Sequence, residues 1–418
     1  MALSAKVGTF LSGTGAAGST VAITGVGFQP KALICWMSGR TEAVDTVGAL
    51  TILPSFGFAA SSNAEYCISG YSADAVAASD TARRKNVDSF ICEIDAAGAN
   101  VGSLGLQSFD ADGFTAVVVT AFTVSRRIHY LALGGDSITN VKQGEFVMPN
   151  VLGNGDITGV GFQPDCVLMI HRRATGAGSG SGLGLSLTIG AASSSSQRAV
   201  VGIRSVDAGV TMDADSYALD VECLMTNPQG GGAPLDRYDF VGFIADGFTL
   251  NCLEVGAANR VGYLALKGGN YRVDSLLTST TGGATIQETG FGFKPAGVLF
   301  LSHCMAETVQ DSNSAHLRLS IGAATGPTER TACAVRDEDA VADSNCAAAV
   351  EFDECYANIN TSTDTIDGLM DLDSMDADGF TTIMDDGDPA AAFVWYVAFG
   401  PAAAGGLTLA LSGISATA

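Results

Sequence analysis

The sequence predicts an all-β protein made of three tandem, homologous antiparallel β-sandwich lobes, jelly-roll-like in type. Three observations predict it. Few windows show a 3.6-residue apolar period, whereas short apolar runs rich in Val, Ile, Thr and Phe are bounded by Gly, Pro, Asn and Asp. Four sequence blocks recur three times in the same order. Two packed sheets in each lobe are a common way to bury such strands.

The repeats define the domain organisation. The first block is Thr-Gly-Val-Gly-Phe-Gln-Pro at 24–30 and 158–164, and Thr-Gly-Phe-Gly-Phe-Lys-Pro at 289–295. Its middle glycines, Gly27, Gly161 and Gly292, lie 134 and 131 residues apart. A period this long is a domain and not a solenoid turn. The predicted lobes are therefore 1–135, 136–269 and 270–400, followed by a Gly/Ala-rich C-terminal tail at 401–418.

Each lobe contains the same predicted strands. Residues 32–37, 167–170 and 298–301 are apolar and follow a proline, which is tolerated at a strand start. Residues 115–123 are rich in Val, Thr and Phe, and the near-continuous apolar run at 127–133 indicates burial on both faces. Asp-Gly before Phe-Thr predicts a turn, because glycine supplies a positive φ. Gly-Gly at 134–135 and 268–269 is expected of flexible linkers between lobes.

Composition and charge exclude several classes of protein. The 418 residues include 21 Lys+Arg against 44 Asp+Glu, a net charge of −23, and a nucleic-acid partner would need a basic face. With 47% hydrophobic and 16% charged residues, neither long disorder nor a coiled coil is expected. The N-terminus has no secretory pattern. The uncharged stretch 389–418 is interrupted by Pro and Gly, so we expect no membrane insertion.

The ten cysteines show no CxxC spacing and are too sparse for a disulfide scaffold. Cys35 aligns with Met169 and Phe300 at the same offset from the first block. A position that accepts Cys, Met or Phe is a core position, where cysteine acts as a small hydrophobe. We therefore expect reduced, buried thiols without a metal or redox role.

Paired aspartates are the strongest candidates for a metal site. The pairs are Asp110 and Asp112, Asp213 and Asp215, Asp371 and Asp373, and Asp376 and Asp378. Calcium prefers clustered carboxylate oxygens, but no window satisfies the EF-hand pattern, and the second lobe has Ile244 where the others have the first aspartate. We interpret these segments as turns and assign no metal ligand, with calcium as the open alternative.

The remaining polar motifs give no catalytic constellation. His129 occupies the position of Gly262 and Trp395 in the other lobes, and no GxSxG, HExxH or GxxxxGK[ST] motif occurs. The glycine-rich segment 176–182 lacks a lysine and is expected to be a flexible surface loop. The basic runs at 83–85 and 172–173 are interpreted as rim charges or contacts to an acidic neighbour. We predict no enzyme, no catalytic or cofactor-binding residue and no cofactor.

One set of motifs resembles a known family. The segments are Gly159-Val160-Gly161-Phe162-Gln163-Pro164-Asp165 with Arg172, then Asp246-Gly247-Phe248, then Tyr263-Leu264-Ala265. They resemble bacteriophage tail-fibre and other virion-surface proteins that carry GVGFQPDxVxxxxR, a DGF turn and a Y-x-A strand. The first lobe departs at Lys31, and the third at Lys294 and Ala296. The resemblance implies a virion structural module and offers no catalytic residues to carry over.

Three hypotheses follow. The first is a bacteriophage structural protein on the particle exterior, a head decoration (cement) or tail-associated protein, assembled in the host cytoplasm and located in the virion. Its partners would be other virion proteins and copies of itself. The alternative is a lectin-like adhesin that binds a host surface glycan through loops such as 40–53 or 227–237. A depolymerase would need two carboxylates across a groove, and the sequence does not pair any. The arrangement of the lobes, as a ring or a string, stays open.

Overall fold

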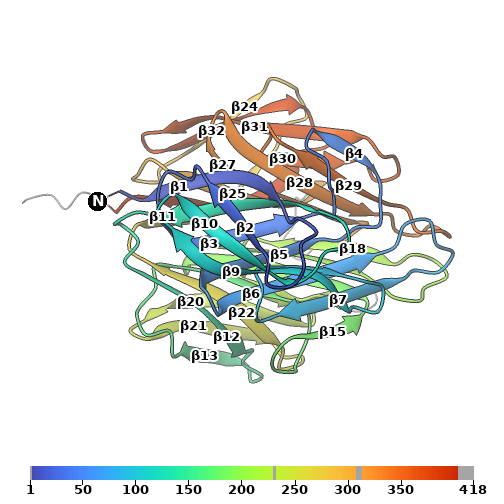
Figure 1. Ribbon diagram of the computed structural model, residues 1–418, viewed down its shortest axis with the longest axis horizontal. Helices are drawn as coiled ribbons and strands as arrows, with labels where there is room; N and C mark the ends of the chain where they lie inside the picture. The colour runs from blue at the N-terminus through green and yellow to red at the C-terminus, as the bar shows by residue number, and fades with distance from the viewer. Residues whose placement is uncertain (1, 229–231, 307–312, 403–418) are drawn as a thin grey trace, which may run out of the picture.

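The computed structural model describes residues 2–228, 232–306 and 313–402 (Figure 1). Every secondary-structure element in these residues is a β-strand. Neighbouring strands pair antiparallel throughout. The predicted all-β, antiparallel sandwich fold is confirmed. Of the predicted tail at 401–418, residues 403–418 lie outside the described residues. The described part contains no helix long and apolar enough to cross a membrane.

The first lobe contributes to one seven-stranded and one four-stranded sheet. The order in the large sheet is β1 (Ser4–Leu11), β11 (Arg127–Gly134), β3 (Pro30–Met37), β5 (Ser55–Ser61), β6 (Ala64–Ser72), β7 (Thr81–Asn86) and β15 (Gly180–Leu183). The order in the small sheet is β2 (Thr20–Thr24), β10 (Gly113–Thr120), β9 (Asn100–Asp110) and β8 (Ile91–Ile94). The strand predicted at 115–123 therefore ends three residues early, at Thr120.

The second lobe repeats this arrangement. Its large sheet is β12 (Asn140–Val147), β22 (Arg260–Lys267), β14 (Cys166–His171), β16 (Leu185–Ser194), β17 (Gln197–Ser205), β18 (Ala214–Leu219) and β26 (Asn313–Ala315). Its small sheet is β13 (Gly153–Thr158), β21 (Gly247–Glu254), β20 (Asp236–Ile244) and β19 (Leu224–Thr226).

The third lobe has the same two sheets. Its large sheet is β23 (Asn270–Leu277), β33 (Ala392–Gly400), β25 (Gly297–Ala306), β27 (Leu317–Gly326), β28 (Glu329–Asp337), β29 (Cys346–Glu351) and β4 (Thr46–Ala49). Its small sheet is β24 (Thr285–Thr289), β32 (Gly379–Asp386), β31 (Ile366–Asp376) and β30 (Tyr356–Ile359).

The three large sheets are linked by a cyclic exchange of strands. β15 leaves the second lobe to pair with β7 of the first, β26 leaves the third to pair with β18 of the second, and β4 leaves the first to pair with β29 of the third. Figure 1 shows the blue β4 beside orange strands of the third lobe and the green β15 beside the blue β7. Each exchanged strand covers an exposed sheet edge. The lobes therefore form a closed ring, and sheet membership crosses each expected lobe boundary.

Each large sheet is buried on both faces, because successive side chains of a strand point to opposite sides. In β3, Cys35 belongs to the apolar core between the two sheets of its own lobe, whereas Ile34 and Trp36 belong to a second core. That second core joins residues of all three lobes, such as Ile170 and Trp395. The near-continuous apolar strands of the sequence therefore have apolar neighbours on both sides, as their composition predicts.

The three lobes also meet through a buried polar contact. β6, β17 and β28 end at the equivalent residues Ser72, Ser205 and Asp337. Oδ2 of Asp337 accepts hydrogen bonds from the hydroxyls of Ser72 and Ser205, at 2.9 and 2.8 Å. All three side chains are nearly inaccessible to solvent. One carboxyl group thus joins one residue from each lobe.

The Gly-Gly junctions are tight turns, and the expectation of flexible linkers is wrong. Gly135 and Gly268 have φ values of 85° and 80°, and a Cβ on either would lie within 2.5 Å of a backbone oxygen. The amide of Gly268 donates to Asp165, and the carbonyl of Gly135 accepts from Lys31. The junctions are held by these contacts because the exchanged strands require the lobes to stay together.

Candidate functional site

The recurring Gly-x-Gly and Asp-Gly blocks are two halves of one structural contact. In each lobe an aspartate carboxylate accepts two backbone N–H groups, at 2.5 to 3.1 Å, from a pair of glycines with positive φ. The pairs are Gly25 and Gly27 with Asp112, Gly159 and Gly161 with Asp246, and Gly290 and Gly292 with Asp378. Successive amides of this kind form a small anion-binding concavity. The amides of Gly161 and Gly159 lower the pKa of Asp246.

Most of the other aspartates of the pairs also have partners within the protein. Asp110 accepts from the hydroxyls of Ser108 and Thr115, both at 2.7 Å. Asp376 is bonded in the same way in the third lobe, and Asp213 and Asp215 both contact Arg204. The described residues contain no group of three or more His, Cys, Asp or Glu side chains that could hold a metal ion. The turn prediction holds at Asp112 and Asp378, whereas it is wrong for Asp371 and Asp373, which lie within β31, and for Asp215, which lies in β18.

The histidines and cysteines pack in the interior. Cys35, Met169 and Phe300 occupy equivalent positions in the three sandwich cores, as the repeat comparison predicts, and all ten cysteines are buried free thiols. His129 stacks on Trp36 and its Nδ1 lies 2.7 Å from the Thr331 hydroxyl. Burial lowers the pKa of His129 to about 3, so the ring is neutral and structural at pH 7.

One pair of carboxyl groups lies close together. Burial raises the pKa of Glu354 to about 10, and a hydrogen bond with Asp371 adds to the shift. Asp371 also accepts from Arg330 at 2.7 Å. Glycosidase carboxyl groups stand about 5 Å or more apart to admit a sugar. Two groups in direct contact leave no room for a substrate, so we interpret this pair as structural.

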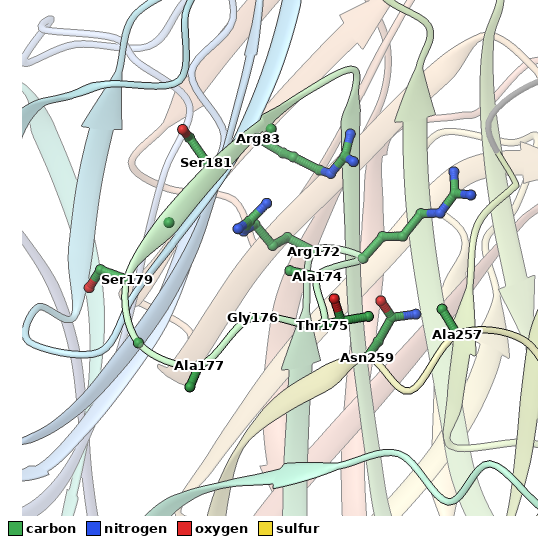
Figure 2. A pocket seen from close by; sticks show the side chains of 14 residues that line it. Arg83, Arg172, Ala174, Thr175, Gly176, Ala177, Ser179, Ser181, Ala257 and Asn259 are labelled. Atoms are coloured by element: carbon green, nitrogen blue, oxygen red, sulfur yellow. The ribbon is translucent and has the colours of Figure 1, made fainter.

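The candidate site is formed where the two basic runs of the sequence meet. Arg83, Arg172 and Arg173 line one cavity of about 480 Å³, together with the glycine-rich segment 176–182 (Figure 2). From the sequence, these arginines are interpreted as two separate groups of rim charges or contacts to an acidic neighbour, about 90 residues apart. The exchange of β15 into the first lobe brings them together, because Gly182 is paired opposite Arg83. The expectation of a flexible surface loop at 176–182 is therefore wrong for 180–182, which belong to the strand β15 (Gly180–Leu183).

Local backbone structure positions the arginines at the end of β14. The last residue of that strand, His171, is fully buried; its Nε2 lies 2.5 Å from the carbonyl of Met225, and its Nδ1 accepts the amide of Arg173 at 3.1 Å. Arg173 has a left-handed backbone with φ of 56°. The turn it makes begins the segment that crosses to the neighbouring lobe. His171 is thus a positioning residue for Arg172 and Arg173.

The cavity is positively charged and poorly neutralised. Arg172 is only 6% exposed, and its Nε is buried without a hydrogen-bond partner. Burial lowers the pKa of Arg172 to about 10, and burial with the charges of Arg172 and Arg173 lowers the pKa of Arg83 to about 10. Both guanidinium groups stay protonated at pH 7. The described residues form no ion pair with either, and Nη1 of Arg83 donates to the carbonyls of Leu183 and Gly184.

The loops expected to bind glycans are only partly free. Segment 40–53 contains β4, which is paired with β29, and Arg40 donates to the carbonyls of Gly48 and Ala348. That segment is built into a junction between lobes, so the expectation of a free loop is wrong there. In segment 227–237, residues 229–231 lie outside the described residues, and Asp236 begins β20.

Comparison with known proteins adds no family. No protein-family model matches this chain, and no curated protein matches it. Among solved structures, a fructofuranosidase from Schwanniomyces occidentalis in complex with fructose covers 93% of this chain and 97% of its own, with 5% identity and a TM-score of 0.15. A similarity this low carries no argument about fold or function.

Proposed function

We propose that this chain is a structural protein on the exterior of a bacteriophage particle, either a head decoration protein or a tail-associated protein. The proposal is supported by the motif resemblance to virion-surface proteins and by the form of the molecule. Its recurring aspartates Asp112, Asp246 and Asp378 accept hydrogen bonds from backbone amides within the fold. We infer that the protein acts by occupying a place in an assembly and not by catalysis.

The observation that carries the proposal is the cyclic exchange of β4, β15 and β26. It gives a single chain three similar faces arranged around one axis. Such a chain matches sites of threefold or near-threefold symmetry, because equivalent faces can make equivalent contacts there. The interlocked edges also resist separation of the lobes, which suits a protein exposed on a particle.

The test is to locate the protein in purified particles. We expect mass spectrometry of density-purified virions to detect the chain in a fixed ratio to the major shell protein, and gold-labelled antibody to decorate intact particles. A multiple of the number of shell facets indicates a head location, and a small fixed number indicates the tail. Presence of the protein in the infected-cell lysate together with its absence from purified particles would refute the proposal.

A second candidate, an adhesin for a host surface glycan, is favoured by one observation. The cavity lined by Arg83 and Arg172 has the size of many small-ligand sites and a positive charge that fits an acidic sugar. We expect an adhesin to retain acidic glycans on an array and to lose them when Arg172 is replaced. An array with no hits at multivalent display contradicts this candidate without affecting the particle test.

A further inference from the structure

We propose that the junction between the first and second lobes holds a binding site for a small oxyanion ligand, one bearing carboxylate, phosphate or sulfate groups, with Arg83, Arg172 and Arg173 as its cationic residues. The proposal does not depend on where the protein acts. It rests on the convergence of these arginines on one cavity, on the fact that none of them forms an ion pair with a described residue, and on the different residues at the equivalent positions of the other two junctions.

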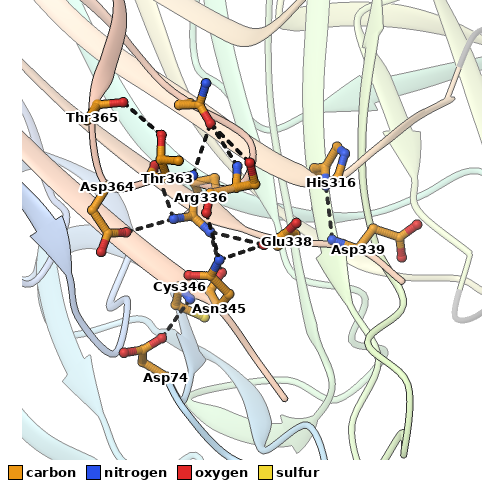
Figure 3. Close-up of polar contacts among 12 residues, drawn as sticks. Asp74, His316, Arg336, Glu338, Asp339, Asn345, Cys346, Thr363, Asp364 and Thr365 are labelled. Carbon is orange, nitrogen blue, oxygen red and sulfur yellow. Dashed lines mark hydrogen bonds and ion pairs between the residues drawn. The ribbon is translucent and has the colours of Figure 1, made fainter. Parts of the chain in front are cut away.

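The first step of the argument is that no described acidic side chain forms an ion pair with Arg83 or Arg172. Other buried arginines form ion pairs: Arg204 pairs with Asp213 and Asp215, and Arg336 pairs with Asp364 at 2.8 Å (Figure 3). Arg318 is buried without an ion pair among the described residues, but it stands alone and donates to the amide oxygen of Asn358. Arg83 and Arg172 form no ion pair among the described residues. Burying unpaired like charges is costly, since each loses hydration without a compensating attraction. An anion in the cavity removes that cost.

The second step is that the cluster is not required by the fold. At the strand position of Arg83, the other two junctions have Ser216 in β18 and Ala348 in β29, as the paired strands show. At the position equivalent to Arg172, the first lobe has Ser38 directly after β3, and the third lobe has His303 within β25. The exchange of strands therefore forms without arginine at either position. A costly cluster that occurs once in three equivalent places is expected to serve binding.

The third step is the fit of the cavity to the ligand. A guanidinium group presents paired N–H donors that match carboxylate and phosphate oxygens. Gly180 and Gly182 pack against Arg172, where an added Cβ would lie 3.3 to 3.4 Å from its terminal nitrogens. These glycines leave the guanidinium space and let the backbone approach a ligand closely. A volume of about 480 Å³ accommodates a molecule of the size of a monosaccharide or citrate, larger than a phosphate ion.

Nearby acids have other partners within the fold. The charge of Asp236 acts on Arg173, but Asp236 itself is buried and hydrogen-bonded to Asn259. Glu145 is held by Lys85 and Arg260, at 2.5 and 2.9 Å. No carboxylate contributes to the pKa shift of Arg172, and Tyr66 is neutral at pH 7 because burial raises its pKa. The net charge of the cavity therefore stays positive in a protein whose overall charge is −23.

Isothermal titration of the full chain at low ionic strength tests the site, with sodium phosphate, sodium sulfate, citrate and glucuronic acid as separate probes. We expect one-to-one binding of at least one probe, and the preferred probe distinguishes a phosphate from a carboxylate ligand. Arg172→Met keeps length and apolar contact and removes the charge. We expect it to weaken binding by about tenfold or more, the effect of losing charged hydrogen bonds. The control, Lys142→Met at an exposed position of β12, should leave affinity within about twofold.

A second measurement separates loss of the site from loss of the fold. Without ligand, Arg172→Met should melt at the same temperature as the wild type or higher, because it removes a buried unpaired charge. The bound probe should raise the melting temperature of the wild type and not that of the variant. Absence of binding for all four probes at millimolar concentration, or equal affinity in wild type and Arg172→Met, would overturn the proposal.

Discussion

At the scale of residues, the glycine of each Asp-Gly-Phe-Thr turn is required by geometry. Gly113, Gly247 and Gly379 have φ values of 148° to 149°, a region that side chains rarely adopt. A Cβ at Gly247 would lie 1.9 Å from the carbonyl oxygen of Ile157. A Cβ at the equivalent glycine would come equally close to a backbone oxygen in all three lobes. The shared backbone shape of the turn therefore explains the repeated glycine without any chemical role.

We predict that Gly247→Ala destabilises the protein by about 3 kcal/mol, from backbone strain and the clash with Ile157. Chemical denaturation followed by tryptophan fluorescence measures it. The matched control is Gly242→Ala on the paired strand, where an added Cβ meets no atom within 4 Å. The control should change stability by less than about 0.5 kcal/mol. Equal effects of the two substitutions contradict the geometric explanation.

The carboxyl group shared by the three lobes gives a second prediction at this scale. Burial raises the pKa of Asp337, and its Oδ1 has no hydrogen-bond partner. Because the folded-state pKa is raised, its contribution to stability is complete below the unfolded pKa and is lost as pH rises through the folded pKa. Asp337→Asn keeps an oxygen for Ser72 and Ser205 without the charge, so it should raise the melting temperature at pH 8.

Asp337→Ala is the matched comparison, because it removes both the charge and the acceptor. It leaves two buried hydroxyls without their partner, and we expect it to cost about 1–3 kcal/mol at pH 6. Differential scanning fluorimetry of both variants at pH 6 and pH 8 gives the comparison. If Asn and Ala behave alike at both pH values, the hydrogen bonds across the axis do not contribute.

At the scale of elements, the sequence predicts the fold class and the buried strands but not the three exchanged strands. Apolar runs near 32–37, 167–170 and 298–301 identify β3, β14 and β25 because burial on both faces leaves a strong pattern. The exchanged strands are short and polar or small, as in the Gly-Ser-Gly-Leu of β15, and carry no such pattern. Their pairing depends on the neighbouring lobe, so the Arg83 and Arg172 cluster that depends on it cannot be found from local sequence.

The pairing of β4 with β29 can be tested with an engineered disulfide between residues 302 positions apart in the sequence. Val47 of β4 and Ala349 of β29 are directly opposite in the ladder and contact the same small apolar cluster. Opposite residues of antiparallel strands lie near disulfide distance. We expect Val47→Cys with Ala349→Cys to oxidise to a disulfide that speeds migration on a non-reducing denaturing gel and stabilises the fold by about 2–4 kcal/mol.

The control pairs Val44→Cys with Ala349→Cys. Val44 is 68% exposed and precedes β4, so it has no partner in the ladder. Its thiol should stay reactive toward a labelling reagent and should not change migration after oxidation. A double variant at 47 and 349 that stays reduced under the same oxidising conditions contradicts the pairing of β4 with the third lobe.

At the scale of the whole molecule, buried ionisable groups set a pH range for stability. Burial raises the pKa of Glu65 and of Glu351 to about 8. The folded protein then binds protons that the unfolded chain has released, so the contribution of these groups to stability falls as pH rises from about 4.5 to about 8. Burial lowers the pKa of His129 to about 3 and of His171 to about 4. These rings stabilise the fold above the unfolded histidine pKa, and that stabilisation is lost as pH falls through it.

We therefore predict that the melting temperature falls between about pH 6.5 and 8, where the histidines have stopped titrating and the glutamates have not, measured between pH 5 and 9 at constant ionic strength. The net charge of −23 acts in the same direction on the alkaline side, because self-repulsion increases as more groups ionise. Glu65→Gln should flatten the alkaline slope, because the amide does not titrate. A melting temperature that keeps rising up to pH 9 contradicts the prediction.

The ring of exchanged strands has a consequence for how such a protein can diversify. Three separate identical chains could form the same ring, but any substitution would then appear three times around the axis. In one continuous polypeptide each substitution appears once. A costly arrangement, such as a group of unneutralised guanidinium side chains, can therefore be confined to one of three places while the other two keep the ring stable. Covalent fusion thus allows a symmetric scaffold to hold an asymmetric feature.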